Sequence, residues 1–255
     1  ALDDILAAAQ LSNLELEGLM SHYATADEGD IHYAIGQHDR FKHVIKHLRD
    51  HSITVPLKHM SNSGGFLNVA HSDYDMVRPG ILLYGAYPDV DGDVRKGIRC
   101  APLLSWKTNV TFIKEVRAGQ AIGYGAMHKV AKHTKIATIE VGYGDGFRRI
   151  LAGRAHVLIR GMRYPVVGRI SMDQTTVDIG MVSDVMVGDE AVLLGRQLDD
   201  EITVFELARQ METIPYEVFT SISARVERRY MFNAQQVHSF VFSNFSLMAR
   251  TILHQ

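Results

Sequence analysis

The chain is poor in the features that mark several specialised classes of protein. It has one cysteine, Cys100, and six prolines in 255 residues. A single cysteine excludes a disulfide-built scaffold and is what a reducing cytoplasm allows, so we expect a cytoplasmic protein. The formal net charge of −2, from 29 acidic and 27 basic residues, argues against a nucleic-acid partner. No apolar run approaches the roughly 18 residues of a membrane span, so we expect no membrane partner.

The first 95 residues alternate helix patterns with short apolar strands. Apolar residues at helical spacing occur over residues 2–9 and again from Phe41 to Leu48. A short helix should open within residues 61–65. The strand that contains Pro56 should either start near this proline or lie at the edge of the sheet. Strands are predicted for residues 16–22, 54–60 and 76–84. This alternation predicts an α/β arrangement with parallel strands, but three such units are too few to close a barrel.

From about residue 100 the pattern becomes that of an all-β domain. Branched and aromatic residues alternate over short stretches, and turn residues such as Arg160-Gly161 separate them. The predicted strands are residues 104–113, 134–141, 156–160 and 164–168. One helix is expected, with Thr203 as its N-cap and Glu206 completing a capping box. Residues 231–255 are apolar without clean periodicity, and no structure is predicted for them.

Several polar residues of the first part follow or interrupt apolar strands. Arg78 lies within VRPGILLYG, where the pattern favours a salt bridge at one end of the sheet over an arginine aimed into a ligand pocket. The segment SNSGG, residues 61–65, reads as an ordinary turn or as an anion cradle. His22 and His59 each lie near a strand end, where active-site residues gather in barrels, although a lone histidine is more often structural.

Three glycine-rich loops in the second part are further candidates. They are AIGYGA around Tyr124, VGYGDG around Tyr143, and GRISMDQ around Met172. Glycine on both sides of Tyr124 leaves its phenol accessible, but each segment alone is equally well a surface loop. The sequence has no metal-ligand spacing such as HExxH or CxxC, no GxSxG and no Walker loop, so no metal site is predicted.

Together these segments resemble the alanine racemase family of pyridoxal-phosphate enzymes. The resemblance runs from about Leu16 to Tyr230 and rests on LEGLMSHYATAD, Gln37 with Arg40-Phe41, HMSNS, VRPGILLYG, IGYGA, VGYGDG, GRISMDQ and SISARVERRY, in the family's order. It implies the C-terminal portion of a (β/α)₈ barrel over residues 1–95 and a mainly β-strand domain over residues 96–230. Residues 231–255 are then a tail of unknown role.

The resemblance implies pyridoxal 5′-phosphate as the cofactor and assigns residues to it. Arg78 would face the pyridine nitrogen and keep it unprotonated, because a guanidinium does not readily give up a proton. His59 would support Arg78, and His22 would lie between Arg78 and a tyrosine of a partner chain. The phosphate would be held by Ser63 and by the backbone of Gly80 and Ile81.

The same resemblance implies that residues of the second part bind the amino-acid substrate and react with it. Tyr124 would be the base that removes the α-proton of L-alanine, while a lysine serves the opposite face. Met172, through its backbone N–H, and Tyr143 would bind the substrate carboxylate. These residues would act in the partner's site of a homodimer, and the product D-alanine would supply peptidoglycan.

Some features of the family are absent from this sequence, and their absence leaves other functions open. The family's Schiff-base lysine lies in a motif like K-A-x-A-Y-G, which this sequence lacks, and Lys58 is no substitute. We therefore expect a truncated product or partial sequence that is inactive by itself. Ala224 stands where a phosphate-contacting tyrosine is common, and Glu227 replaces a proline. The alternatives are a serine or broad-specificity racemase and a catalytically dead dimerising remnant.

Overall fold

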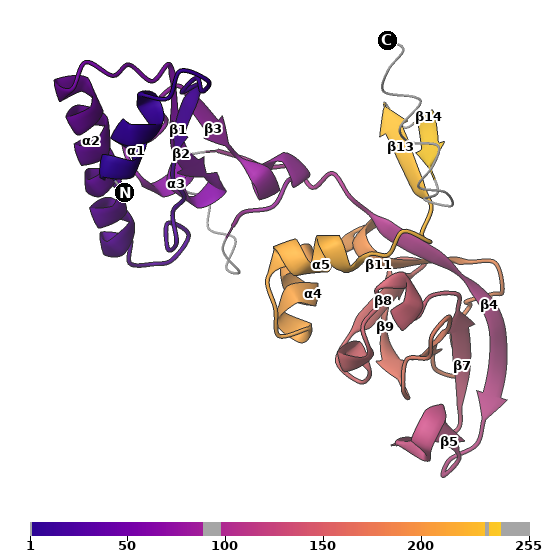
Figure 1. Cartoon of the computed structure of the whole chain (residues 1–255). Helices are drawn as coiled ribbons and strands as arrows, with labels where there is room; N and C mark the ends of the chain where they lie inside the picture. The colour runs from indigo at the N-terminus through magenta and orange to yellow at the C-terminus, as the bar shows by residue number, and fades with distance from the viewer. Residues whose placement is uncertain (1, 89–97, 233–234, 241–255) are drawn as a thin grey trace. The chain divides into compact units, whose positions relative to one another are not determined.

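The computed structural model describes residues 2–88, 98–232 and 235–240, and it divides into two compact units (Figure 1). The units are Ala1–Leu103 and Leu104–Gln255. The domain boundary predicted between residues 95 and 96 lies outside the described residues. No helix in the described part of the chain is both long enough and apolar enough to cross a membrane.

The N-terminal unit contains three parallel strands, as predicted, and they pair in the order β1-β2-β3. Its strands and helices are α1 (Leu2–Ala9), β1 (Gly18–Met20), α2 (His32–Asp50), β2 (Leu57–Asn62), α3 (Ser63–Asn68) and β3 (Met76–Arg78). Strand β2 starts directly after Pro56, whose missing N–H leaves no ladder donor. Helix α3 opens at Ser63 with Asn62 as its N-cap, so the short helix expected here is confirmed.

The prediction of a strand over residues 76–84 is wrong for its second half. Strand β3 ends at Arg78, and residues Gly80–Tyr84 form a 3₁₀ turn, η1. Pro79 has no N–H and adopts an αR backbone, and Gly80 follows with φ +43°, so the extended conformation cannot continue. The apolar run ILLY suggests a strand because periodicity alone does not separate a short apolar turn from a strand, and in this turn only Ile81 is buried.

Helix α2 packs its apolar face on the sheet, and Figure 1 shows it alongside the three strands. Phe41 and Ala34 of α2 join Met60 of β2 in one buried cluster. His38 lies on the same buried face and contacts the ring of Tyr74 edge-on, with 5.6 Å between the ring centroids. This cluster packs α2 against β2, and Leu19 of β1 lies against it.

The C-terminal unit is built on an antiparallel sheet whose pairings close on themselves. The strand order is β12-β11-β4-β7-β10-β9-β8, and β8 also pairs with β11. Six strands thus form a closed ring, which leaves β12 outside it. The strands are β4 (Trp106–Val116), β7 (Thr134–Ile139), β8 (His156–Ile159), β9 (Met162–Val167), β10 (Thr175–Asp178), β11 (Glu190–Gln197) and β12 (Asp200–Ile202). Closure removes the exposed sheet edges that a row of separate hairpins would leave.

The predicted all-β character is confirmed, but several elements were not foreseen. Besides β10, β11 and β12, the structure has the short pair β5 (Ala121–Ile122) and β6 (His128–Lys129). Helix α4 (Val204–Gln210) is the expected one, whereas α5 (Pro215–Ser221) was missed. Strands β13 (Arg228–Phe232) and β14 (Gln235–Phe240) form a separate hairpin, so part of the tail is structured. Residues 241–255 lie outside the described part.

Helix α4 provides a test of the capping argument. The hydroxyl of Thr203 accepts a hydrogen bond from the N–H of Glu206 at 3.1 Å, while the carboxylate of Glu206 pairs with Arg163 instead of closing a capping box. Thr203→Ala should therefore lower the free energy of unfolding by about 1 kcal/mol. Thr203→Ser keeps the hydroxyl and should change it by a few tenths at most. Urea unfolding of the three proteins measures this, and equal losses for Ala and Ser would contradict the cap.

Candidate functional site

The predicted site residues of the first unit gather at one end of the parallel sheet. His22 follows β1, Ser63 follows β2, and Arg78 ends β3. Asn62 and Arg78 are register partners across β2 and β3. Because the three strands run in the same direction, these residues share the carboxyl edge of the sheet, where parallel α/β folds place their ligands.

Arg78 is the centre of this edge. One terminal nitrogen donates to Nδ1 of His59. The other donates to the carbonyl oxygen of Ser21 at 2.8 Å and of Met60 at 3.3 Å, and lies 3.3 Å from Nδ1 of His22. Among the described residues its hydrogen-bond partners are histidines and carbonyls, so the salt bridge favoured by the sequence pattern is not the arrangement found here. The guanidinium is instead fixed in position with its charge uncompensated by a carboxylate in that part of the chain.

His59 is suited to accept a hydrogen bond from Arg78. Burial, and secondarily the positive charge of Arg78, lowers the pKa of His59 below its ordinary value. A neutral imidazole has one nitrogen free to accept, and the contact with Arg78 assigns that role to Nδ1. His59 therefore supports the guanidinium without adding a second positive charge.

The histidine pKa values predict how this unit responds to acid. Burial and the charge of Lys42 lower the pKa of His38, as burial and Arg78 do for His59. The unfolded chain then binds more protons than the folded one, so stability should fall as the pH drops below about 6.5, the ordinary histidine value.

This acid response can be measured with a matched control. Urea unfolding at about pH 7.5 and about pH 5.5 should give a smaller difference for His38→Phe than for the unchanged chain, because phenylalanine cannot bind a proton there. His43→Gln, an exposed position on α2, should leave the difference unaltered. The same difference in all three proteins would refute the role of His38.

Asn62 is a site residue that the sequence reasoning missed. Its side-chain oxygen accepts from the N–H of Gly65 at 2.8 Å, which fixes the amide orientation as the N-cap of α3. Its amide nitrogen lies 3.1 Å from Nε2 of His22. The signal available in the sequence was an asparagine directly before a short helix, which marks a cap. The same amide therefore starts a helix and orients the His22 ring.

The small residues after β2 and β3 lie close together and leave backbone donors available. The hydroxyl of Ser63 donates to the carbonyl oxygen of Pro79, and a Cβ placed on Gly80 would lie 3.7 Å from that hydroxyl. Gly80 and Ile81 begin the η1 turn, so their N–H groups have no acceptor within it. A hydroxyl beside such N–H groups is a suitable donor set for a phosphate.

Lys58 is at the wrong place to serve this edge. It lies near the start of β2, and its ammonium group pairs with Asp75 at 2.8 Å and donates to the carbonyl oxygen of Val55 at 3.1 Å. The backbone N–H of Lys58 also donates to Asp75, at 2.8 Å. These contacts bind the Lys58 ammonium group to Asp75 and Val55 and not to the residues around Arg78.

Tyr124 stands on an exposed turn of the second unit. It opens a one-turn 3₁₀ helix, η3 (Tyr124–Ala126), between β5 and β6. The flanking Gly123 and Gly125 both have φ near +70°, and a Cβ on either would come within 3.3 Å of Arg169. The backbone conformation at both positions therefore requires glycine. Tyr124, which lies between them, is 71% exposed.

Tyr143 and Met172 lie on two loops that are joined by backbone hydrogen bonds. The N–H of Tyr143 donates to the carbonyl oxygen of Ser171 at 3.0 Å, and that of Gly144 donates to Met172 at 2.9 Å. Both side chains are about half exposed. Two residues assigned to one substrate group therefore occupy neighbouring positions in the structure.

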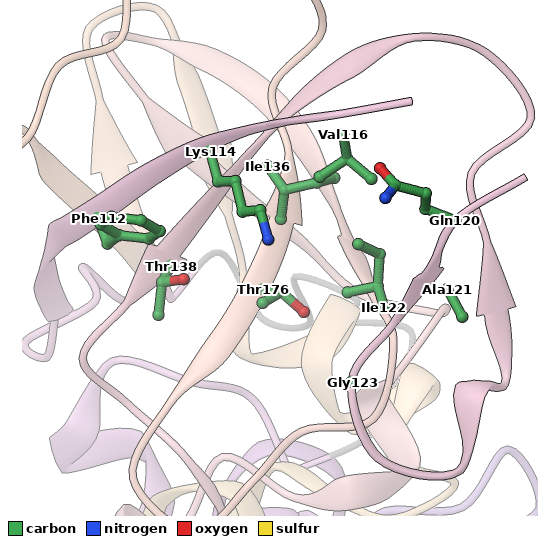
Figure 2. Close-up of a pocket in the computed structure, with 10 residues that line it drawn as sticks. All are labelled: Phe112, Lys114, Val116, Gln120, Ala121, Ile122, Gly123, Ile136, Thr138 and Thr176. Atoms are coloured by element: carbon green, nitrogen blue, oxygen red, sulfur yellow. The ribbon is translucent and has the colours of Figure 1, made fainter. Parts of the chain in front are cut away.

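A shallow hollow of about 250 Å³ lies in the C-terminal unit beside β5, the strand that leads to Tyr124 (Figure 2). Figure 2 shows Phe112, Lys114 and Val116 of β4 on the same face as Thr138 of β7 and Thr176 of β10, the next two strands of the sheet. The hollow contains none of the predicted site residues. The candidate site residues accordingly form two groups, one in each unit.

The comparisons with known proteins agree across both units. Residues 1–88 match the family described as alanine racemase, N-terminal domain, and residues 103–230 match alanine racemase, C-terminal domain. The chain is 42% identical over 232 residues to alanine racemase 2 of Caldanaerobacter subterraneus, and 44% identical over 220 residues to the alanine racemase of Halothermothrix orenii. These alignments include 91% and 86% of this chain but only 59% and 58% of the relatives.

Solved structures give the same result. An alanine racemase of Clostridium difficile 630 in complex with cycloserine superposes with a TM-score of 0.88 at 36% identity, over 95% of this chain and 64% of the other. The Bacillus anthracis alanine racemase with bound L-Ala-P gives a TM-score of 0.84 at 35% identity, over 90% and 58%. The predicted resemblance is confirmed: the chain belongs to the alanine racemase family and spans about three fifths of the length of the relatives it matches.

Proposed function

We propose that this chain is part of an alanine racemase that interconverts L-alanine and D-alanine with pyridoxal 5′-phosphate. It supplies the sheet edge that carries Arg78 and the C-terminal unit that carries Tyr124. The observation that carries the proposal is the run of contacts from His59 through Arg78 to His22, beside Ser63 and Gly80. A fixed cation near a set of phosphate donors matches the two polar ends of this cofactor, its ring nitrogen and its phosphate.

The residues present fit the cofactor, and each has a distinct task. When bound, pyridoxal phosphate would supply an electron-withdrawing ring that acidifies the α-proton of the attached amino acid. Ser63 and the N–H groups of Gly80 and Ile81 would hold the phosphate. Arg78 would donate to the ring nitrogen and keep it unprotonated, because a guanidinium retains its protons. This limits the electron withdrawal and so disfavours side reactions.

Proton transfer on one face of the α-carbon would fall to the second unit. Racemisation needs one group on each face of that carbon, and Tyr124 would serve the face of L-alanine as general base. The exposure of its phenol supports a role in a site completed by another chain, so we propose a homodimer with shared sites. Met172, through its N–H, and Tyr143 would bind the substrate carboxylate.

The relatives support an alanine substrate. The Bacillus anthracis protein was solved with bound L-Ala-P, and the curated relatives are named alanine racemases. We propose that the product D-alanine enters peptidoglycan. A cytoplasmic location accords with the single cysteine of the chain.

A fusion protein tests this function directly. The part of the Halothermothrix orenii racemase that this chain does not span would be placed ahead of Leu2, and the fusion would be purified with pyridoxal phosphate. We expect it to convert L-alanine to D-alanine, followed by chiral chromatography, and to act on serine less efficiently. A folded, cofactor-loaded fusion without alanine turnover would contradict the proposal, and faster turnover of serine would favour a serine racemase.

A further inference from the structure

We propose that Arg225 is a positioning residue that locks the Tyr143 loop to the Met172 loop and so shapes the substrate-carboxylate site. The two loops are residues 142–146 and 171–173. The proposal rests on the proposed function, because it concerns the residues assigned there to the substrate. Arg225 itself is not placed against the substrate.

The backbone contacts show that the two loops form one structural unit. The N–H groups of Tyr143 and Gly144 donate to consecutive carbonyl oxygens, those of Ser171 and Met172, at 3.0 and 2.9 Å. The side chain of Asp145 accepts from the N–H of Gly142 at 2.9 Å, which folds the first loop into its 3₁₀ turn, η4 (Tyr143–Asp145). Only two backbone hydrogen bonds join the loops, so their alignment depends on what else holds them together.

Close packing leaves little freedom in this alignment. A Cβ on Gly142 would lie 2.3 Å from the carbonyl oxygen of Ser171, so only glycine fits there. A Cβ on Gly144 would lie 2.9 Å from a terminal nitrogen of Arg225 and 3.0 Å from the carbonyl oxygen of Met172. The guanidinium of Arg225 therefore lies directly against the loop that carries Tyr143.

Arg225 bridges a carboxylate from each loop. Its Nε contacts Asp145 at 2.8 Å, and its Nη2 donates to Asp173. The chain just before Arg225 is tied to the same loop, because the N–H of Ser223 donates to the carbonyl oxygen of Asp145 at 2.9 Å. A planar guanidinium can engage two carboxylates in different directions, which a lysine ammonium on a flexible stem does less well.

Arg225 also neutralises negative charge, because it pairs with the carboxylates of both Asp145 and Asp173. Asp173 follows Met172 directly, and the backbone N–H of Met172 is the group assigned to the substrate carboxylate. Without Arg225, two aspartates would remain beside the binding position of an anion. Their repulsion would weaken substrate binding even if the loops stayed in place.

Hydrogen exchange on the full 255-residue chain tests the bridge without relying on activity. In Arg225→Gln the amides of Tyr143 and Gly144 should exchange about tenfold faster, while the amides of β7 exchange as before. Arg154→Gln, which removes an exposed ion pair with Glu212 elsewhere in the unit, is the matched control and should leave both amides unaffected. Arg225→Lys keeps the charge but should not restore the protection. Unaltered exchange in Arg225→Gln, or full protection in Arg225→Lys, would overturn the proposal.

Kinetics of the racemase fusion test the link to substrate. Arg225→Gln should raise KM for L-alanine about tenfold with a smaller change in kcat, because the change affects binding of the carboxylate more than proton transfer. Arg225→Lys, which keeps the positive charge, should raise KM less. Faster exchange with an unaltered KM would overturn the positioning role. If the unsubstituted fusion had no turnover, the proposed function would fail, and the exchange result would still decide whether Arg225 locks the loops.

Discussion

The 255-residue chain, purified alone and mixed with pyridoxal phosphate, is expected to racemise L-alanine at least about 10⁴-fold more slowly than the fusion described above. The reason is the absent lysine motif. The resemblance to the family implies one lysine that both bonds the cofactor and serves one face of the α-carbon. Losing it removes covalent catalysis and one of the two bases together.

The lysines that the structure describes in the N-terminal unit cannot take over these tasks. Lys42 and Lys46 are on the exposed face of α2 and pair with Asp39 and Asp50. Lys58 is held by Asp75 near the start of β2, away from the end that carries Arg78. Each ammonium group is therefore paired, and none lies at the carboxyl ends of the strands.

Absorbance and borohydride reduction measure this outcome. The fusion should show a cofactor absorbance band that borohydride abolishes, with the reduced cofactor attached to a lysine of the added segment. The chain alone should yield no stoichiometric attachment, and Lys58→Arg should leave its spectrum the same. Stoichiometric attachment in the chain alone, together with alanine turnover, would show that another lysine serves.

Local patterns predicted the N-terminal unit better than the C-terminal one. Helix α2 and strand β2 follow from apolar spacing and from Pro56, and these signals lie within a few residues of the elements they define. Strand β11 forms between β4 and β8, more than 30 residues away in sequence on the nearer side. Strand β11 also pairs with β12 across a tight turn, but its pairs with β4 and β8 depend on closure of the ring of strands, which no local window contains.

The candidate site shows the same division between local and distant signals. Ser63, Gly80 and Tyr124 were identified because they lie in short motifs. Asn62 acts on His22, 40 residues away, and Arg225 acts on Asp173, 52 residues away. Hydrogen bonds over such separations leave no periodic trace, so the sequence could indicate Asn62 as a helix cap but not its contact with His22, and it gave no indication of the contact between Arg225 and Asp173.

Tyr124→Phe in the fusion should slow the removal of the α-proton from L-alanine by about 10²–10⁴-fold, the usual contribution of a general base. The substitution removes one hydroxyl and no buried contact, because the side chain is 71% exposed on its turn. The substitution also leaves unchanged the close packing of Gly123 and Gly125 against Arg169. Cofactor binding should remain nearly intact, since the residues proposed to hold it, Arg78 and Ser63 among them, lie in the other unit.

The measurement is α-deuterium exchange in heavy water, started separately from each enantiomer. Exchange from L-alanine should fall by the full factor, whereas exchange from D-alanine should fall less, because the lysine serves that face. Tyr33→Phe removes the hydroxyl of another exposed tyrosine, on α2, and should leave both rates as they are. A one-sided loss is what distinguishes a base from a structural residue, because a distorted or poorly loaded site slows both directions alike. Equal losses from the two enantiomers would therefore assign Tyr124 a structural role, and no loss from either would remove it from the reaction.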